Sequence, residues 1–366
     1  MNDDYSLVIP VATVAIPANP HATRELAGDG PTTHTSLATR LVSTIATICT
    51  NNTIRIADIT MIAICSAGMD RQEDAQATAT AVTAAIRADS SSSWSPHLTV
   101  AVTSDALAAL GAGIDVDHLP AGRKGPSSSL AADDQGPPSS VLGGHAIVIS
   151  GTGTVAMAWR GDGSVARASG FGPLLGDVGS GYSIGMSLLA TVVQGADGRG
   201  PACPLLTSRL LKHLQLAKVP DLIAWAYGPG SLVASDWSLI ASLSRIVHDA
   251  ATEGDEVAVS LLGEAADGLA GAIRAACAAC APTQITTCVA VGGNLVGHSA
   301  LLLDLLTTRV PAGVRLVRPR RDPAHGAAVY GKLVADGRVP SQAVYSVADA
   351  APAAVAAAAA AAAAAA

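Results

Sequence analysis

Aromatic residues are scarce in this chain of 366 residues, which is long enough for two compact domains. They make up 3% of the composition, and phenylalanine occurs once. Because 49% of the residues are nonetheless hydrophobic, Ala, Val, Leu and Ile must fill the cores. Such a composition favours helices and buried strands over a β-sandwich built around aromatic side chains.

Positive charge is also in short supply. The chain has 22 Lys and Arg residues against 29 Asp and Glu residues, which gives a formal net charge of -7. This balance provides no electrostatic attraction to nucleic acid or to an anionic membrane surface. We therefore expect neither nucleic acid nor membrane as a partner.

The beginning of the sequence lacks the pattern of a secretory signal. Asp3 and Asp4 stand where basic residues are usual, and no apolar run of the needed length follows. The alanine run at the other end is long but too weakly apolar to predict a membrane anchor, and it has a high helix propensity. We expect a cytoplasmic protein with an exposed alanine tail that is disordered or helical.

The six cysteines lie at irregular spacings that do not form a disulfide framework. Cys277 and Cys280 make a C-x-x-C pattern within "AIRAACAACA", a run typical of a buried helix. Metal ligands usually come from loops, so we interpret the pair as core thiols. A metal or cluster ligand pair is the alternative, and the sequence predicts no metal site.

Apolar β-branched runs alternate with Ala- and Leu-rich helical stretches, which predicts an α/β fold with mostly parallel sheets. A hairpin is expected over 154–169, with its turn at 161–163. The other predicted strands cover 61–68, 97–105, 145–153 and 285–294.

A stretch rich in Pro, Ser, Gly and Asp, residues 114–142, interrupts this alternation. It has few core-forming residues, so we interpret it as a flexible insertion between two lobes. The sequence thus predicts an N-terminal lobe over 1–113, a C-terminal lobe over 143–335 and a C-terminal segment over 336–366.

Asp105 closes the predicted strand "LTVAVTSD". Ligands of open α/β sheets collect at the carboxyl ends of the strands. A carboxylate there can accept the proton of a hydroxyl that attacks phosphorus, as the catalytic Asp of kinases does. The alternative is that Asp105, or Ser104 before it, only caps the next helix.

Two short glycine turns follow other predicted strands. In "SGTGT", Gly151 and Gly153 allow backbone N–H groups to surround an anion, and Thr152 adds a hydroxyl donor. In "VGGN", the paired glycines Gly292 and Gly293 allow a flat ligand such as an adenine ring to lie against the backbone. A plain tight turn is the alternative at both places.

The densest glycine cluster is "ASGFGPLLGDVGSGYSIG", residues 168–185. A helix is expected to begin after Ser180, its predicted N-cap, with Asp177 near the positive end of the helix dipole. So many glycines make sense where a ligand approaches the backbone closely. The alternative is that Asp177 is only a stabilising charge.

Taken in order, five segments resemble N-acetylglucosamine kinases and the wider BadF/BadG/BcrA/BcrD ATPase group of the actin/hexokinase/Hsp70 superfamily. The resemblance covers roughly residues 15–335 outside the insertion. It implies two ribonuclease-H-like lobes with a central cleft, and ATP- and Mg²⁺-dependent phosphorylation of the 6-hydroxyl of N-acetylglucosamine. It leaves open whether the protein forms a homodimer. The segments are SGTGTVAMAWRGDG, GFGPLLGDVGSGYSIG, DGRGP, VAVGGNL and DPAHGAAVYG.

The resemblance also implies roles for individual residues, with Asp105 as the catalytic base. Phe171 stands where the family usually has Trp, and Val178 stands where it usually has Glu. The implied sugar-binding residues are Asn19, Gly170, Phe171, Gly172 and Asp177. The implied nucleotide-binding residues are Gly151, Thr152, Gly153, Thr154, Ala241, Gly292 and Gly293.

One family motif, D-G-G-G-T in the first phosphate-binding hairpin, does not occur in the sequence. The start of the chain lines up with only the last part of that hairpin, so we expect a first lobe truncated at its N-terminus. Phosphoryl transfer depends on positioning phosphates and Mg²⁺, so this departure puts activity in doubt. The alternatives are a catalytically impaired sugar-binding or regulatory homologue, and an ATPase that activates a partner enzyme. Such activators hold an iron–sulfur cluster with cysteines from each subunit, a pattern this chain lacks.

Overall fold

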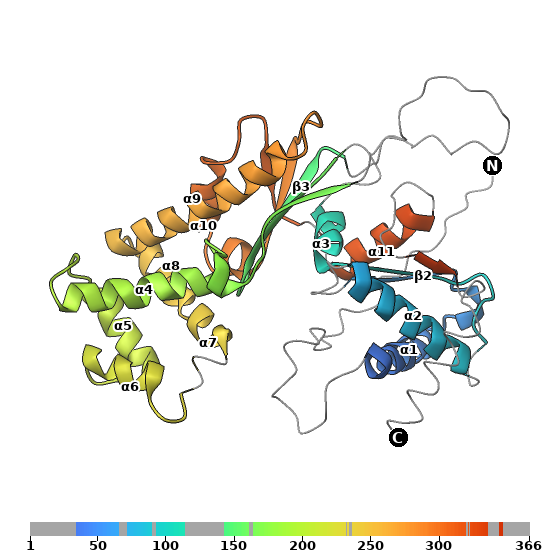
Figure 1. Ribbon diagram of the computed structural model, residues 1–366, viewed down its shortest axis with the longest axis horizontal. Helices are drawn as coiled ribbons and strands as arrows, with labels where there is room; N and C mark the ends of the chain where they lie inside the picture. The colour runs from blue at the N-terminus through green and yellow to red at the C-terminus, as the bar shows by residue number, and fades with distance from the viewer. Residues whose placement is uncertain are drawn as a thin grey trace. The chain divides into compact units, whose positions relative to one another are not determined.

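A computed structural model describes the chain in two units (Figure 1). Unit 1 comprises Met1–Gly136 with Arg320–Ala366, and unit 2 comprises Pro137–Pro319. The predicted insertion, the alanine tail and Asn19 lie outside the described residues. The described residues are 34–65, 72–89, 93–113, 143–160, 164–231, 233, 236–319, 321, 323–335 and 344–346.

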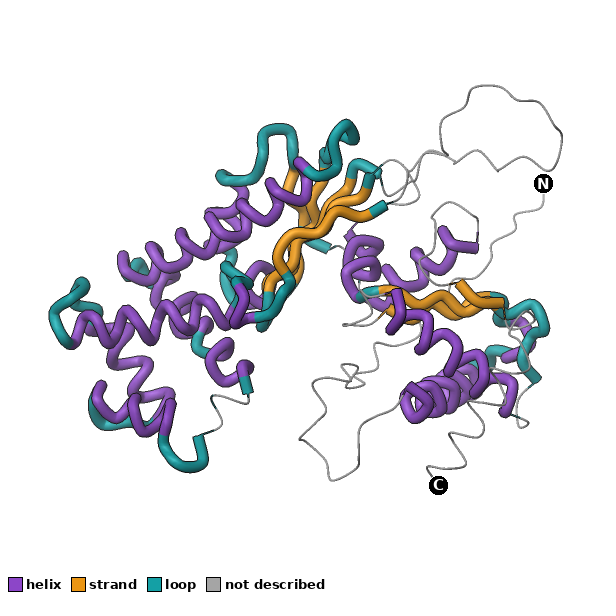
Figure 2. The backbone as a smooth tube through the Cα atoms, viewed as in Figure 1, coloured by secondary structure: helices purple, strands orange, loops and turns teal. Residues whose placement is uncertain are grey.

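The sheet of unit 1 has the order β1-β2-β8, with β1 parallel to β2 and β8 antiparallel to it. Figure 2 shows this sheet between α3 and α11 on one face and α1 and α2 on the other. The strands are β1 (Met61–Cys65), β2 (Thr99–Thr103) and β8 (Val344–Ser346). The helices are α1 (His34–Asn51), η1 (Ile56–Asp58), α2 (Gln72–Ala88), α3 (Asp105–Gly113) and α11 (Pro323–Ala335).

Helix α2 shows why this part of the sequence folds as it does. Among its buried side chains, Ala75, Ala79, Val82 and Ile86 recur every three or four residues, and Thr78, Ala81, Thr83 and Ala84 widen the buried face. That spacing places them on one face of a helix, which packs against β2 and α1. Small and aliphatic side chains thus form the core of unit 1, as the composition predicts.

Helix α11 packs on α3, and this contact differs from the expected domain division. A Cβ at Gly326 would overlap the carbonyl oxygen of Ala108, and one at Gly111 would lie 2.7 Å from the Gly326 oxygen. Two helices can approach so closely only where side chains are absent. Residues 320–335 therefore group with unit 1, although the sequence analysis placed them in the second lobe.

Unit 2 contains a five-stranded sheet of order β5-β4-β3-β6-β7. The strands of the predicted hairpin are confirmed, because β4 pairs antiparallel with β5; β3 also pairs antiparallel with β4. The turn predicted at 161–163 lies outside the described residues. The pairs β3–β6 and β6–β7 are parallel, so the sheets are mixed rather than mostly parallel. The strands are β3 (His145–Ser150), β4 (Thr154–Trp159), β5 (Val165–Ser169), β6 (Thr287–Val291) and β7 (Arg315–Val317).

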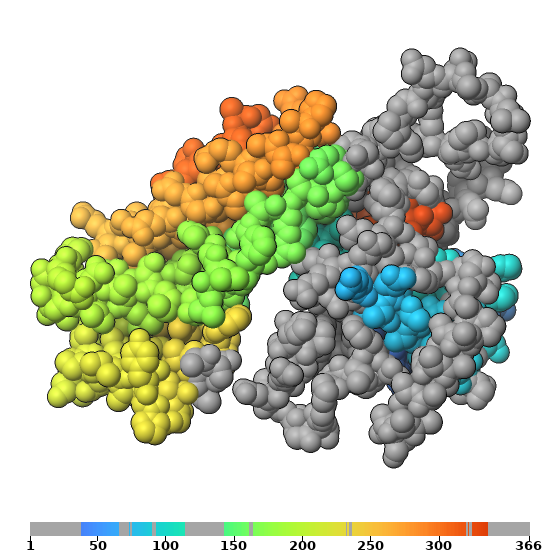
Figure 3. Space-filling view, viewed as in Figure 1, coloured from blue at the N-terminus to red at the C-terminus, as the bar shows by residue number. Residues whose placement is uncertain are grey.

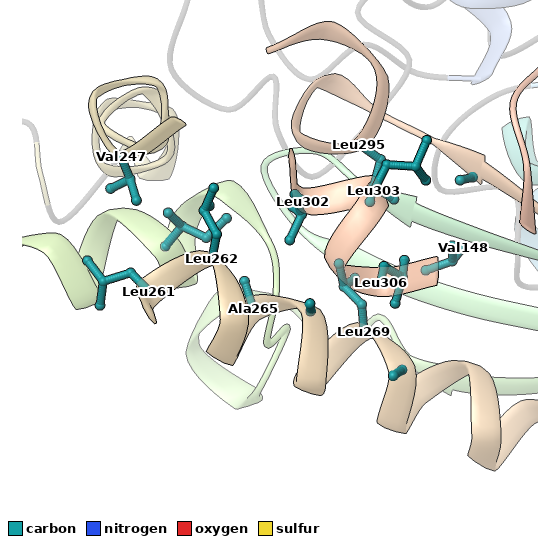
Figure 4. Close-up of a cluster of buried hydrophobic side chains, with 14 of the residues drawn as sticks. Val148, Val247, Leu261, Leu262, Ala265, Leu269, Leu295, Leu302, Leu303 and Leu306 are labelled. Atoms are coloured by element: carbon teal, nitrogen blue, oxygen red, sulfur yellow. The ribbon is translucent and has the colours of Figure 1, made fainter. Parts of the chain in front are cut away.

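The longest helix, α9, packs along β3, β4 and β5 and against α8 and α10. Figure 4 shows the centre of this core, where Leu262 and Leu269 of α9 point toward Leu302 and Leu306 of α10. The helices of unit 2 are η3 (Pro173–Leu175), α4 (Gly181–Ala196), α5 (Pro204–Leu214), η4 (Val219–Asp221), α6 (Leu222–Tyr227), α7 (Trp237–Ser242), α8 (Ser244–Thr252), α9 (Glu256–Ala278), the π-helical turn η5 (Gly293–Gly297) and α10 (Leu301–Thr307).

Cys277 lies at the end of α9 and Cys280 just beyond it, and neither forms a disulfide. Cys280 is fully buried in the core, and burial raises the pKa of Cys277 to about 11. The Cys277 thiol is therefore protonated at neutral pH. Among the described residues, no helix has the length and apolar character needed to cross a bilayer.

Candidate functional site

Asp177 lies in the glycine-rich loop (residues 170–180) and is buried. Its Oδ2 accepts a hydrogen bond from the backbone amide of Thr154 at 3.1 Å, and its Oδ1 accepts one from the amide of Gly170 at 3.1 Å. The carboxylate therefore ties this loop to the turn between β3 and β4.

The loop ends where α4 begins, and the predicted N-cap is confirmed. The hydroxyl of Ser180 accepts a hydrogen bond from the amide of Ser183 at 3.1 Å. Gly179 before it has a φ of 84°, and a Cβ there would lie 2.7 Å from the carbonyl oxygen of Ala265. Only glycine fits this position, because both its backbone conformation and its contact with α9 exclude a side chain.

The 150–154 turn, "SGTGT", lies directly against the start of α4. The amide of Gly181 donates to the oxygen of Gly151 at 2.7 Å, and the amide of Tyr182 donates to the oxygen of Thr152 at 3.3 Å. The amide of Gly151 is bonded within the turn, to the oxygen of Gly153. With the Thr154 amide held by Asp177, the turn can offer a ligand the amides of Thr152 and Gly153 and the exposed Thr152 hydroxyl.

The 292–293 turn lies beside the 150–154 turn because β6 runs parallel to β3, with Val291 opposite Ile149. Gly292 has a φ of 101°, and a Cβ there would overlap the backbone of Ser150. Ala241 is buried in α7, and its carbonyl oxygen would lie 3.1 Å from a Cβ on Gly181. The predicted nucleotide-binding residues of unit 2 therefore come together around the start of α4.

The predicted sugar-binding residues of unit 2 form the other side of this arrangement. Both backbone polar groups of Gly170 are hydrogen-bonded: its amide donates to Asp177, and its carbonyl oxygen accepts from Arg167 at 2.7 Å. Phe171 next to it is 75% exposed. In Figure 3 the segments drawn in green, which belong to unit 2, form a continuous surface on the face in view. Asp177 also lines a surface hollow of about 370 Å³ between this loop, α4 and α9, together with Tyr182 and Glu264.

Asp105 lies in unit 1, at the carboxyl edge of its sheet. It is the first residue of α3 and is exposed, and Ser104 occupies the N-cap position before it. Cys65 ends the neighbouring parallel strand, opposite Thr103. Burial, with a smaller contribution from the charge of Asp105, raises the pKa of the Cys65 thiol to about 12. The strand β2 ends at Thr103, so Asp105 begins the following helix instead of closing the strand as predicted, but it still lies at the carboxyl end of the sheet.

Two buried polar side chains that the motif analysis did not place in the site lie behind the glycine turns. Asn294 donates to the oxygen of Gly151 at 2.9 Å. The Nδ1 atom of His248 lies 2.8 Å from the hydroxyl of Ser299, and burial with the nearby His298 lowers the pKa of His248 to about 4. The available signal was a polar residue, Asn294, placed directly after a glycine pair that ends an apolar strand.

Comparison with solved structures shows the fold. A candidate N-acetylglucosamine kinase from Chromobacterium violaceum matches with a TM-score of 0.51 and 22% identity, covering 82% of this chain and 87% of that one. A second candidate N-acetylglucosamine kinase, from Porphyromonas gingivalis, matches with a TM-score of 0.50 and 18% identity, covering 81% of this chain and 83% of that one. The expected actin-like ATPase fold of the α/β class is therefore confirmed.

Sequence comparison identifies two curated relatives. The N-acetyl-D-glucosamine kinase of Dictyostelium discoideum is 35% identical over 188 residues, which are 50% of this chain and 57% of that protein. The N-acetylmuramic acid/N-acetylglucosamine kinase of Clostridium acetobutylicum is 30% identical over 194 residues, 52% of this chain and 61% of that protein. The chain thus spans less than two thirds of the length of these relatives.

A family model matches residues 139–331, which include all of unit 2 beyond residue 138 as well as most of α11. This match covers more than half of the chain and contains both glycine turns, the glycine-rich loop and Asp177. The chain belongs to the BadF/BadG/BcrA/BcrD ATPase family.

Proposed function

We propose that this chain is an ATP-dependent sugar kinase that phosphorylates the 6-hydroxyl of N-acetylglucosamine. The observation that carries the proposal is the meeting of the 150–154 turn, the 292–293 turn and the glycine-rich loop around the start of α4. Two relatives named as kinases of this sugar support the choice of substrate.

The nucleotide is proposed to bind along the two turns. Gly151, Thr152, Gly153 and Thr154 are assigned to the phosphates, because amides and hydroxyls in a turn attract anions. The Thr152 and Gly153 amides and the exposed Thr152 hydroxyl are proposed as the donors, whereas Gly151 and Thr154 are proposed to shape the turn through the bonds of their own amides. The remaining nucleotide contacts are assigned to Ala241, Gly292 and Gly293.

The sugar is proposed to bind at the glycine-rich loop. A polyhydroxylated ligand needs a hydrogen-bond partner for nearly every hydroxyl that it buries. The carboxylate of Asp177 and the backbone at Gly170 and Gly172 are suited to this, and the exposed ring of Phe171 offers an apolar surface. Asn19 is assigned to the same ligand on the basis of the family resemblance.

Asp105 is proposed as the general base. Its carboxylate accepts the proton of the sugar 6-hydroxyl as that oxygen bonds to the γ-phosphorus and the bond to the ADP oxygen breaks. Mg²⁺ is proposed as the metal that neutralises the phosphates. Among the described residues, no group of three His, Cys, Asp or Glu side chains is arranged to hold a metal ion.

The test is ADP release by the purified chain with ATP, Mg²⁺ and N-acetylglucosamine, with phosphorus NMR to locate the phosphate on the sugar. We expect sugar-dependent ADP release, a phosphate coupled to C6, and loss of turnover in Asp105→Asn. Glu73→Gln is a control on the same unit, at an exposed position of α2. Turnover that Asp105→Asn leaves intact would overturn the role of the base.

The remaining outcomes identify the alternatives. A rise in melting temperature with N-acetylglucosamine but background ADP release would replace the kinase with a sugar-binding homologue. ATP hydrolysis that ignores the sugar, together with iron and sulfide in the purified protein, would replace it with an activating ATPase. Either result rejects the proposed reaction.

A further inference from the structure

A buried chain of hydrogen bonds runs behind the glycine turns of unit 2. Asn294 is 2% exposed, and its side-chain nitrogen donates to the oxygen of Gly151 at 2.9 Å and to the hydroxyl of Ser150 at 3.1 Å. The hydroxyl of Ser150 in turn donates to the oxygen of Gly179 at 2.6 Å. One amide therefore connects the 292–293 turn with the 150–154 turn and, through Ser150, with the glycine-rich loop.

The packing around these hydrogen bonds leaves little room for another orientation of the Asn294 side chain. The oxygen of Gly151 accepts hydrogen bonds from both Asn294 and the amide of Gly181, so both of its lone pairs are used. A Cβ on Gly181 would lie 3.1 Å from that oxygen and 3.3 Å from the Asn294 nitrogen. A shift of the Asn294 side-chain amide must therefore move either the start of α4 or the 150–154 turn.

The opposite end of the amide faces a histidine. The Oδ1 atom of Asn294 and the Nε2 atom of His248 are both buried without a hydrogen-bond partner among the described residues, so each is left with an unused acceptor or donor. Asn294 also raises the pKa of His248, against the larger lowering effect of burial, which places the two side chains near each other. His248 is fully buried, and its Nδ1 is 2.8 Å from the hydroxyl of Ser299. With the proton on Nε2, the ring can accept from Ser299 and donate to Asn294, which keeps the amide nitrogen directed at Gly151.

We propose that Asn294 and His248 are positioning residues of the site. Asn294 fixes the 150–154 turn, the 292–293 turn and the glycine-rich loop in position relative to one another. His248 sets the orientation of the Asn294 side-chain amide. This inference rests on the proposed function, because the relative position matters only if those segments hold a nucleotide and a sugar. Neither side chain is assigned a contact with substrate.

The test uses Asn294→Asp, which keeps the shape of the side chain but replaces the amide donor with an acceptor. Facing the oxygen of Gly151, the carboxylate cannot make the bond, and a buried acceptor is left unpaired. We expect faster hydrogen exchange at 150–154 and 179–182 in the ligand-free protein, and nucleotide affinity weakened by about tenfold or more. The melting temperature is measured in parallel.

Leu210→Ala is the control for a purely structural effect. Leu210 is buried in α5 and takes no part in the hydrogen-bond chain. This substitution lowers the melting temperature by removing core contacts, and we expect unchanged ADP affinity and unchanged exchange at 150–154. If it weakens ADP binding as much as Asn294→Asp does at an equal loss of melting temperature, the positioning role is rejected.

A pair of substitutions at His248 tests the second half of the inference. His248→Gln retains a donor near the position of Nε2, whereas His248→Leu removes it. We expect the glutamine variant to keep near-normal ADP affinity and the leucine variant to behave like Asn294→Asp. Equal ADP affinities of the glutamine and leucine variants would overturn the role of His248.

The two readouts also separate this inference from the proposed function. If the unaltered protein neither binds ADP nor releases it, the proposed function fails. The exchange of 150–154 and 179–182 still reports on the hydrogen-bond chain in that case. Unchanged exchange in Asn294→Asp would overturn the positioning role whatever the activity.

Discussion

The Oδ2 atom of Asp177 accepts a hydrogen bond from the backbone amide of Thr154 at 3.1 Å. Thr154 begins the hairpin strand β4, whereas Asp177 belongs to the loop that leads into α4. The second carboxylate oxygen accepts from Gly170. One buried side chain thereby fixes the 150–154 turn and the glycine-rich loop of unit 2, and any ligand bound by these two segments depends on it.

Substitution of Asp177 by Asn is expected to reduce both stability and sugar affinity. The amide side chain has a single acceptor oxygen, so one of the two backbone amides loses its partner. A buried donor without a partner costs about 1–3 kcal/mol. Urea unfolding measures the loss of stability, and calorimetry with N-acetylglucosamine measures the affinity.

Asp304→Asn is the control, because Asp304 is exposed on α10 of the same unit. It should leave both quantities unchanged. An Asp177→Asn variant with normal stability and normal sugar affinity would contradict both the structural role of the two hydrogen bonds and the proposed sugar contact.

Gly179→Ala is expected to destabilise unit 2, whereas Gly271→Ala is expected to stabilise it. A Cβ at Gly179 meets the side chain of Leu269 and the oxygen of Ala265, at a positive φ. Gly271 lies within α9 with no atom within 4 Å of the added Cβ, and alanine is favoured over glycine in a helix by about 1 kcal/mol. Thermal unfolding of both variants provides the comparison, and a shift of the same sign in both would refute it.

The elements that the sequence predicted correctly depend on short-range signals. The hairpin of β4 and β5 follows from two apolar runs around a glycine turn, and the N-cap at Ser180 follows from a serine before an apolar helix. The 150–154 and 292–293 turns became neighbours because each ends a strand of one sheet. Strand ends therefore predict much of the candidate site.

Other features depend on contacts between distant segments. The contact of Gly326 with Ala108 joins helices on either side of unit 2 in the sequence, and no local pattern marks it. Similarly, the dipole of α4 predicts an anion near its start, but not that Asp177 bonds Thr154. His248 lies in an ordinary amphipathic helix, and only the tertiary structure places its ring beside Asn294.

Gly326→Val is expected to loosen unit 1 selectively. The valine side chain would overlap the carbonyl oxygen of Ala108, so α11 must move away from α3. Hydrogen exchange should rise in 105–113 and 323–335 and remain unchanged in α9 of unit 2. Ala335→Ser, at an exposed position of α11, is the matched control. Faster exchange in α9 alone would place α11 with the other unit.

The stability of unit 2 is expected to fall as pH decreases from 6.5 toward 4. Burial and the neighbouring ring of His298, with centroids 5.3 Å apart, lower the pKa of His248 from 6.5 to about 4. The unfolded chain therefore binds a proton in this range that the folded chain does not, which favours unfolding by up to about 3 kcal/mol at pH 4. Above pH 6.5 the imidazole is neutral in both the folded and the unfolded chain, so this loss of stability is absent there.

Urea unfolding of the unaltered protein and of His248→Gln between pH 7.5 and pH 4.5 measures this contribution, since glutamine does not titrate. The variant should lose less stability than the unaltered protein over the same range. His298 is partly buried, and its pKa is also lowered, by burial and by Arg245 against the opposing effect of Asp249, so His298→Gln serves as the comparison. Because His298 is the less buried ring, its substitution should remove a smaller part of the pH dependence. Parallel curves for the unaltered protein and His248→Gln would show that this imidazole does not stay neutral in the folded state.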